Sequence, residues 1–116
     1  MSHKIVLPLP PSVNHTYTRT PNGSALTRQA REWKELAQWE AKTTLRYWKI
    51  CDQKVVLEIW IFWADRRKRD CDNLLKLLQD ALQGIVYTDD RWALPRVMDW
   101  DVDNSRPRVE VIPRIL

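Results

Sequence analysis

The stretch Val-Val-Leu-Glu-Ile-Trp-Ile-Phe-Trp at residues 55–63 decides which fold this chain can adopt. Its residues are β-branched, aromatic or otherwise apolar, and only Glu58 interrupts them. Such side chains favour a β-strand, because they pack well on a pleated surface. A strand that is apolar on both faces is also covered on both faces, whereas a half-exposed strand alternates with polar residues. Residues 55–63 are therefore predicted to form a central strand of a sheet.

Two elements are predicted before this strand. Residues 4–9 are mostly apolar and are followed by Pro10 and Pro11, which predicts a short strand at the edge of a sheet. Residues 10–24 are expected to form an irregular loop. From Thr27 onwards, apolar residues recur at the three- and four-residue spacing of an amphipathic helix, at Ala30, Trp33, Ala37, Ala41, Leu45 and Trp48.

The residues after the central strand predict a second helix and two more strands. Gly84 is placed to end this helix. The apolar stripe of the helix consists of Leu74, Leu75, Leu78, Ala81 and Leu82. Residues 97–102 and 109–112 are expected to pair as a β-hairpin across a polar turn at residues 103–107. This order predicts an α/β fold: a single domain over residues 1–116, with a small mixed sheet packed against two main helices.

The composition fits a globular domain that can bind a polyanion. The chain has 116 residues and a net charge of +4, from 19 lysine and arginine residues and 15 acidic residues. This modest excess permits a nucleic-acid partner without requiring one. Seven tryptophans are expected mainly in the core and at interfaces.

The two cysteines are too few for a disulfide framework and lack the spacing of a metal site. Both are therefore expected to be reduced thiols. Neither a signal peptide nor an apolar run long enough to span a membrane is evident. We expect a soluble, cytoplasmic protein that has no membrane partner.

Acidic and basic side chains are crowded together just after the central strand. Asp70 and Asp72 are separated by one residue. They follow a cationic run of four residues, Arg66, Arg67, Lys68 and Arg69. Neighbouring carboxylates repel each other unless a cation or a proton compensates them. A divalent metal ion would do so, and the adjacent cations suggest a phosphate as its other ligand. The cluster therefore suggests phosphodiester chemistry on a nucleic acid.

Two further features extend this candidate metal site. Lys76 falls one helical turn after Asp72, so both side chains are expected on the same face. A second acidic pair, Asp89 and Asp90, follows the helix, but spacing alone does not prove that it returns to Asp72. Oxygen ligands at this density suit Mg²⁺, with Mn²⁺ as a substitute, whereas zinc favours histidine or cysteine. No organic cofactor is expected.

The residue types alone leave a plainer interpretation open. Asp72 could simply cap the helix, and Lys76 could pair with Asp72 or Asp80 at four-residue spacing. The cationic run could be a solvated loop.

Three stretches resemble the RusA-type Holliday junction resolvases, small metal-dependent endodeoxyribonucleases of bacteria and their phages. They are residues 7–14 (LPLPPSVN), residues 65–76 (DRRKRDCDNLLK) together with 80–82, and residues 89–90. The second stretch is the most specific. Cys71 stands where an aliphatic residue is more usual, and residues 91–97 depart further, because Pro95 interrupts the expected strand.

This resemblance implies an activity and a set of site residues. Asp70, Asp72 and Asp90 correspond to the acidic triad that binds the metal ion, and Lys76 corresponds to the catalytic lysine. The resemblance also implies a homodimer that nicks opposed strands of a four-way DNA junction symmetrically during DNA recombination and repair. Contacts with DNA are expected from Arg66, Arg67, Lys68, Arg69, Lys76 and Asn14.

Two rival functions use some of the same residues. A non-catalytic DNA-binding accessory module would use the cationic run, but it would leave Asp70 and Asp72 repelling the bound phosphates. A nuclease that acts on other branched DNA would use the whole site.

Overall fold

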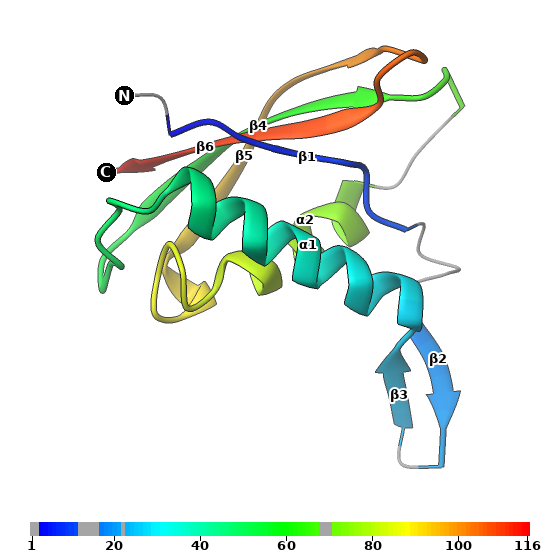
Figure 1. Ribbon diagram of the computed structural model, residues 1–116, viewed down its shortest axis with the longest axis horizontal. Coiled ribbons are helices and arrows are strands. Elements are labelled where there is room, and N and C mark those ends of the chain that lie inside the picture. The colour runs from blue at the N-terminus through cyan, green and yellow to red at the C-terminus, as the bar shows by residue number, and fades with distance from the viewer. Residues whose placement is uncertain (1–2, 12–16, 22, 68–70) are drawn as a thin grey trace.

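Two helices pack on one face of a four-stranded mixed sheet, and a two-stranded ribbon projects beside them (Figure 1). The computed structural model describes residues 3–11, 17–21, 23–67 and 71–116. The elements in chain order are β1 (Ile5–Leu7), β2 (Tyr17–Thr20), β3 (Gly23–Leu26), α1 (Arg28–Thr44), β4 (Val55–Trp63), α2 (Cys71–Leu82), the short 3₁₀ helix η2 (Asp90–Trp92), β5 (Ala93–Val102) and β6 (Arg108–Ile115). The prediction of an α/β fold with a small mixed sheet and two main helices is confirmed.

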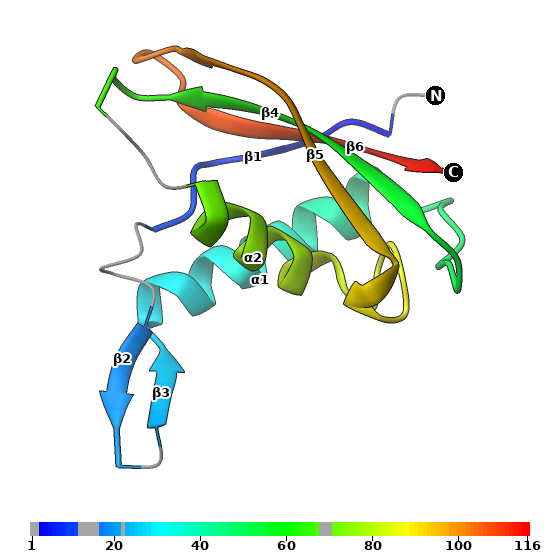
Figure 2. The ribbon, with the colours of Figure 1, turned by 180° about the vertical axis from the view of Figure 1, so that it is seen from behind.

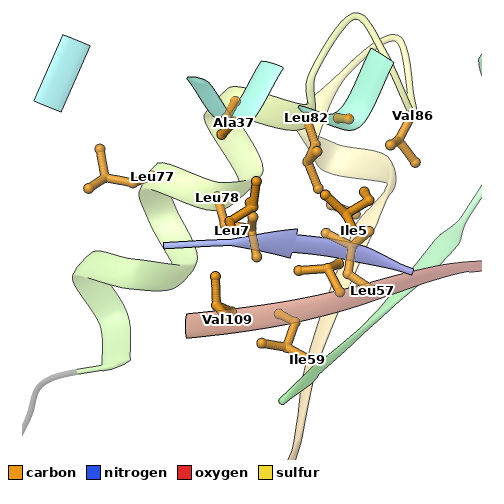
Figure 3. Packing of buried hydrophobic residues seen from close by; sticks show 14 of the residues in the cluster. Ile5, Leu7, Ala37, Leu57, Ile59, Leu77, Leu78, Leu82, Val86 and Val109 are labelled. Carbon is orange, nitrogen blue, oxygen red and sulfur yellow. The ribbon is translucent and has the colours of Figure 1, made fainter. Parts of the chain in front are cut away.

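Strand β4 lies in the interior of the sheet, as predicted, with β6 on one side and β5 on the other. Leu57 and Ile59 are fully buried and point into the core beneath the helices (Figure 3). Burial of one such side chain contributes about 1.5–3 kcal/mol of favourable transfer free energy. The apolar stretch that suggested a central strand thus supplies much of the core.

Helix α1 begins at a side-chain cap. The Thr27 hydroxyl accepts a hydrogen bond from the amide of Ala30 at 3.2 Å. The buried residues of the helix are Ala30, Trp33, Ala37 and Ala41, which confirms the predicted spacing. The helix ends at Thr44, before the last apolar residues expected in it. Beyond that end, the indole nitrogen of Trp48 donates to the carbonyl of Val86 at 3.0 Å.

Helix α2 carries the chain from the end of β4 back to the start of β5 (Figure 2). Strand β5 runs parallel to β4, with Ala93 opposite Val55, so the connection must return along the whole strand. The buried face of α2 consists of Leu74, Leu77, Leu78, Ala81 and Leu82. Gly84 follows the helix with a φ of 86°, a left-handed conformation that glycine adopts without strain.

The predicted hairpin of two C-terminal strands is wrong. Strand β5 pairs with one edge of β4, and β6 pairs antiparallel with the other edge, so residues 103–107 cross over the end of β4. The physical reason is that a buried strand such as β4 needs hydrogen-bonding partners on both edges. A polar turn is compatible with a hairpin and with a crossover to the other edge of β4, so it does not distinguish between them. Pro95 lies within β5, because an outer strand leaves one side of its backbone unpaired.

The prediction of an irregular loop over residues 10–24 is also wrong in part. Strands β2 and β3 form an antiparallel ribbon, with Tyr17 opposite Leu26 and Thr20 opposite Gly23. Gly23 has a φ of 123°, a backbone conformation that favours glycine, at the tight turn between β2 and β3. The ribbon has too few apolar residues to produce the alternating pattern by which a strand is recognised in sequence.

Both cysteines are free thiols, as expected. Burial, together with the neighbouring Asp52 carboxylate, raises the pKa of the Cys51 thiol, so this group is protonated at neutral pH. Among the described residues, no helix is both long and apolar enough to span a membrane.

Arg108 holds the crossover between β5 and β6 in place. Its guanidinium pairs with Asp103 at 2.9 Å and with Glu110 at 2.8 Å. It also lies over the ring of Phe62, 3.9 Å from the centroid, where a cation is attracted by the ring face. Lys4 reaches the same Glu110 at 3.0 Å, so the network also joins β6 to the segment before β1.

We predict that this network makes the fold sensitive to acid. Hydrogen bonds from Ser105 and Arg108 lower the pKa of Asp103. Burial opposes ionisation of Glu110, but hydrogen bonds from Arg108 and Lys4 lower its pKa overall. Such carboxylates stabilise the fold above their unfolded pKa values, about 3.9 and 4.3, and this stabilisation is lost as the pH falls. The urea midpoint should therefore decrease between about pH 5 and pH 3.

The matched variant is Arg108→Met, which keeps much of the side-chain length and removes the charge. Its urea midpoint should be lower at pH 7 and should vary less over the same acidic range. An unchanged pH dependence in this variant would show that other groups cause the acid sensitivity.

Candidate active site

The start of α2 carries two of the side chains that the sequence predicts for an active site. Asp72 lies in the first turn and Lys76 one turn later, and both are exposed. Residues one turn apart on a helix are neighbours on its surface, so a single phosphate group could approach both. Four predicted site residues lie outside the described residues: Asn14, Lys68, Arg69 and Asp70.

Lys76 contacts the β2–β3 ribbon. Its ammonium nitrogen lies 5.1 Å from the centroid of the Tyr17 ring, within the range of a cation–π interaction. A hydrogen bond with Tyr17, together with the weaker effect of the Asp80 charge, raises the pKa of Lys76. Among the ion pairs of the described residues, none joins Lys76 to Asp72 or Asp80. The lysine is therefore a charged group beside the ribbon.

Two hydrogen bonds fix the proline-rich segment that leads to this surface. The indole nitrogen of Trp33 donates to the carbonyl of Pro8 at 2.8 Å, and the side-chain amide nitrogen of Asn73 donates to the carbonyl of Pro11 at 3.1 Å. These two bonds tie the segment to α1 and α2. Sequence reasoning missed both residues as positioning residues. The signal in the sequence was the side-chain amide of Asn73, a hydrogen-bond donor in the first turn of the predicted helix, together with the prolines of residues 8–11, whose carbonyls can accept.

The cationic run is partly neutralised within the chain. Arg67 pairs with Asp65 at 2.9 Å, and its backbone amide donates to the same carboxylate at 3.0 Å. The hydrogen bond that the Arg67 guanidinium donates to the Asp65 carboxylate raises the pKa of Arg67. A phosphate would have to compete with Asp65 for this guanidinium, whereas Arg66 is exposed on the same loop.

The second acidic pair begins helix η2. Asp89 is its cap: the carboxylate accepts a hydrogen bond from the amide of Arg91 at 3.0 Å, and this bond lowers the pKa of Asp89. Asp90 is the first residue of η2 and is exposed. Because Asp89 is engaged as a cap, Asp90 is the better candidate for a ligand.

Asp72 and Asp90 lie at opposite ends of α2. The Tyr87 hydroxyl donates to the carbonyl of Gln79 at 2.7 Å, which fixes the segment before η2 against the last turns of the helix. From Asp72 to Gln79 the helix rises about 10 Å. Figure 2 shows the segment that leads into β5 beside the far end of α2. One chain therefore does not bring Asp90 to the surface that carries Asp72 and Lys76.

The donor chemistry at the start of α2 fits a hard divalent cation. Asp72 supplies carboxylate oxygens, and Asp70 is a second aspartate two residues earlier. Ligand sets of oxygen atoms suit Mg²⁺ or Mn²⁺. Within the part of the chain that the structure describes, no three acidic, histidine or cysteine side chains gather closely enough to hold a metal ion. Asp70, which lies beyond that part, would be a further ligand of such an ion.

An α/β domain with an acidic and a cationic side chain on one exposed helical face is a candidate phosphodiesterase, and comparison with known proteins identifies its family. The family described as endodeoxyribonuclease RusA matches residues 8–112. The crossover junction endodeoxyribonuclease RusA of Aquifex aeolicus (strain VF5) is 33% identical over 87 residues. That match covers 72% of this chain and 66% of the relative, slightly less than two thirds of its length. The chain belongs to the RusA endodeoxyribonuclease family, as the resemblance of its motifs predicts.

We predict that Tyr17→Phe lowers the pKa of Lys76. The substitution removes the hydroxyl that raises this pKa and keeps the aromatic ring. The value should move towards the ordinary lysine pKa of about 10.4. The measurement is an NMR titration of the Lys76 side chain. Tyr47→Phe, at a tyrosine that is 70% exposed elsewhere on the surface, is the matched control. Identical Lys76 titrations in both variants would contradict the assigned contact.

Proposed function

We propose that this protein is a Mg²⁺-dependent endodeoxyribonuclease that resolves four-way DNA junctions. The observation that carries the proposal is the exposed pair of Asp72 and Lys76 at the start of α2, in a chain of the RusA endodeoxyribonuclease family. The Aquifex relative is named a crossover junction endodeoxyribonuclease, and we extend that activity to this chain. A DNA substrate also agrees with the expected cytoplasmic location.

Each residue of the proposed site has a chemical task. Asp70 and Asp72 would hold Mg²⁺, for which Mn²⁺ could substitute. The bound ion would polarise the scissile phosphate and lower the pKa of a bound water molecule. The charged Lys76 ammonium, oriented by Tyr17, would stabilise negative charge that develops on the phosphate oxygens. Flanking phosphates would be held by Arg66, Arg67, Lys68, Arg69 and Asn14.

The distribution of charge supports a DNA partner. Residues 1–31 contain four lysine or arginine residues and no acidic residue, whereas 15 cations and 15 acids balance from Glu32 onwards. The net charge of +4 thus belongs to the segment that contains the β2–β3 ribbon. Arg19 on this ribbon is exposed, and Tyr17 at its base touches Lys76. The positive charge of Arg19 beside the proposed site would attract a polyanion.

We further propose that the functional unit is a homodimer. The implied triad of Asp70, Asp72 and Asp90 does not assemble within one chain if Asp90 stays at the far end of α2. In a dimer with two-fold symmetry, each copy could supply Asp90 to the other, because such an interface makes every contact twice. The two resulting sites would then cut two strands of a junction.

We predict that Asp72→Asn reduces Mg²⁺-dependent cleavage of a labelled four-way junction by roughly 10²-fold or more, because a bound metal ion supplies several kcal/mol of transition-state stabilisation. Junction affinity should be unchanged or higher, since loss of a negative charge does not weaken attraction to phosphate. Glu35→Gln, which removes an exposed carboxylate from α1, is the control and should cleave normally.

Full cleavage by Asp72→Asn would remove this residue from the metal site. The same assay separates the rival functions. Binding without Mg²⁺-dependent nicks in the unchanged protein would indicate an accessory module. Equal rates on fork and junction substrates would indicate a nuclease for branched DNA in general.

We predict that two inactive variants, Asp72→Asn and Asp90→Asn, restore cleavage when their subunits are mixed. A heterodimer would contain one intact site, formed by Asp72 of one chain and Asp90 of the other. With random exchange, roughly a quarter of all sites would be intact. The products should be mainly single nicks, because the second site of each heterodimer lacks both carboxylates. A mixture as inactive as either variant alone would place all ligands in one chain.

A further inference from the structure

The β2–β3 ribbon projects from the domain without a covering layer. It extends beyond the start of α1, away from the four-stranded sheet (Figures 1 and 2). Its exposed residues include Thr18, Arg19, Thr20 and Ala25. A two-stranded ribbon that no other element covers is marginally stable in water, because it buries little apolar surface. A projecting, polar ribbon of this kind is suited to contact with a polar partner outside the domain.

The register of the ribbon gives it two different faces. Residues that pair directly across an antiparallel ladder lie on the same face, and successive residues of a strand alternate between faces. Tyr17, Arg19 and Leu26 therefore share one face, here called the inner face. Thr18 and Thr20 lie on the opposite face, here called the outer face. Arg19 is the only charged residue in the sequence of the ribbon, so all of the ribbon's charge belongs to the inner face.

The inner face is continuous with the proposed active site at the base of the ribbon. Leu26 packs against the core, and the ring of Tyr17 lies 5.1 Å from the Lys76 ammonium. Arg19 is two residues beyond Tyr17, which is about 7 Å along the strand. Its backbone thus lies on the order of 10 Å from the Lys76 ammonium, the axial length of about three nucleotides of one DNA strand. One DNA strand could therefore contact both cations.

The charge of Arg19 is available to a polyanion. Within the ranges that the structure describes, no carboxylate forms an ion pair with this guanidinium. Arg28 at the start of α1, by contrast, pairs with Glu32 at 2.9 Å. Because no acidic residue precedes Glu32 in the sequence, a phosphate on the inner face would meet no carboxylate of the ribbon.

We propose that the inner face of the ribbon binds one duplex arm of the DNA, with Arg19 on a backbone phosphate about three nucleotides from the phosphate that is cleaved. The position of the cleaved phosphate rests on the proposed nuclease function. The major groove of B-DNA admits a two-stranded ribbon, and an exposed guanidinium beside hydroxyl groups suits phosphate oxygens. Contacts to phosphate fix the register of a protein on a duplex without reading its sequence. The ribbon therefore positions the strand at Lys76 and does not select bases.

We predict that Arg19→Gln weakens binding of a fluorescein-labelled four-way junction roughly 5- to 10-fold at about 0.1 M salt for each subunit that contacts the DNA, because one phosphate contact is lost. Fluorescence anisotropy in EDTA measures the dissociation constant across a salt series without cleavage. The slope of log affinity against log salt should decrease by about 0.9 for each bound subunit. The urea midpoint should be unchanged, since the side chain is exposed.

The matched variant exchanges two neighbours, Thr18→Arg together with Arg19→Thr. This exchange keeps the composition and the net charge and moves the guanidinium to the outer face. It should bind the junction as weakly as Arg19→Gln. Arg46→Gln, at an exposed arginine beyond the far end of α1, is the control and should bind as tightly as the unchanged protein.

Neutral phosphates locate the contact on the DNA. Methylphosphonates are placed one at a time at the backbone positions around the cleaved bond, and each removes a single negative charge. A methylphosphonate about three nucleotides from that bond should weaken binding by the unchanged protein but not by Arg19→Gln, in which the contact is already lost. Equal effects on both proteins at every position would contradict the contact.

Three further outcomes would overturn the proposed arm: normal binding by Arg19→Gln, normal binding by the exchange variant, or an equal loss in Arg46→Gln. The fate of the nuclease function is read separately, by adding Mg²⁺. If junction binding depends on Arg19 but the unchanged protein never cleaves, the ribbon contact stands and the proposed activity fails. If the unchanged protein cleaves the junction and its binding does not depend on Arg19, the activity stands and the ribbon contact fails.

Discussion

The parallel pairing of β4 with β5 is the constraint on which the arrangement of this molecule depends. Parallel neighbours cannot be joined by a tight turn, so the chain must return along the sheet, and α2 makes that return. The cationic loop and Asp72 therefore lie at one end of the helix, and Asp90 lies at the other. In the proposed homodimer, this separation is the reason that Asp90 would come from a second chain.

The proposed site is held to the core by side chains. Trp33 and Asn73 bind carbonyls of the proline-rich segment, and Tyr17 at the base of the ribbon contacts Lys76. The core is formed by β1, β4 and β6 under two helices, and the ion pairs of Arg108 hold the crossover between β5 and β6. One face of α2 is therefore exposed at its start and accessible to a large substrate. The buried leucines on the opposite face fix the backbone of the helix.

Sequence reasoning predicts the parts of this fold that have strong local patterns. The apolar run of β4 and the helical spacing of α1 and α2 identified those elements, because burial imposes a period on the chain. The prediction that β5 and β6 form a hairpin was wrong, because β4 lies between them. That long-range pairing leaves no signal in the sequence of the turn. Asp72 and Lys76 lie on the helix surface as predicted. The distance between Asp72 and Asp90 could not be predicted, because it depends on the direction of β5 and not on the spacing of the two residues along the chain.

Electron paramagnetic resonance of Mn²⁺ binding, recorded while the protein is diluted through its dimer dissociation, tests most directly whether the acidic site forms between two chains. Metal binds tightly only where its ligands are assembled, so affinity should follow the fraction of dimer. We predict tight binding by the dimer, weak binding by the monomer, and weak binding at all concentrations for Asp90→Asn. A monomer that binds Mn²⁺ as tightly as the dimer would contradict a site shared between two copies.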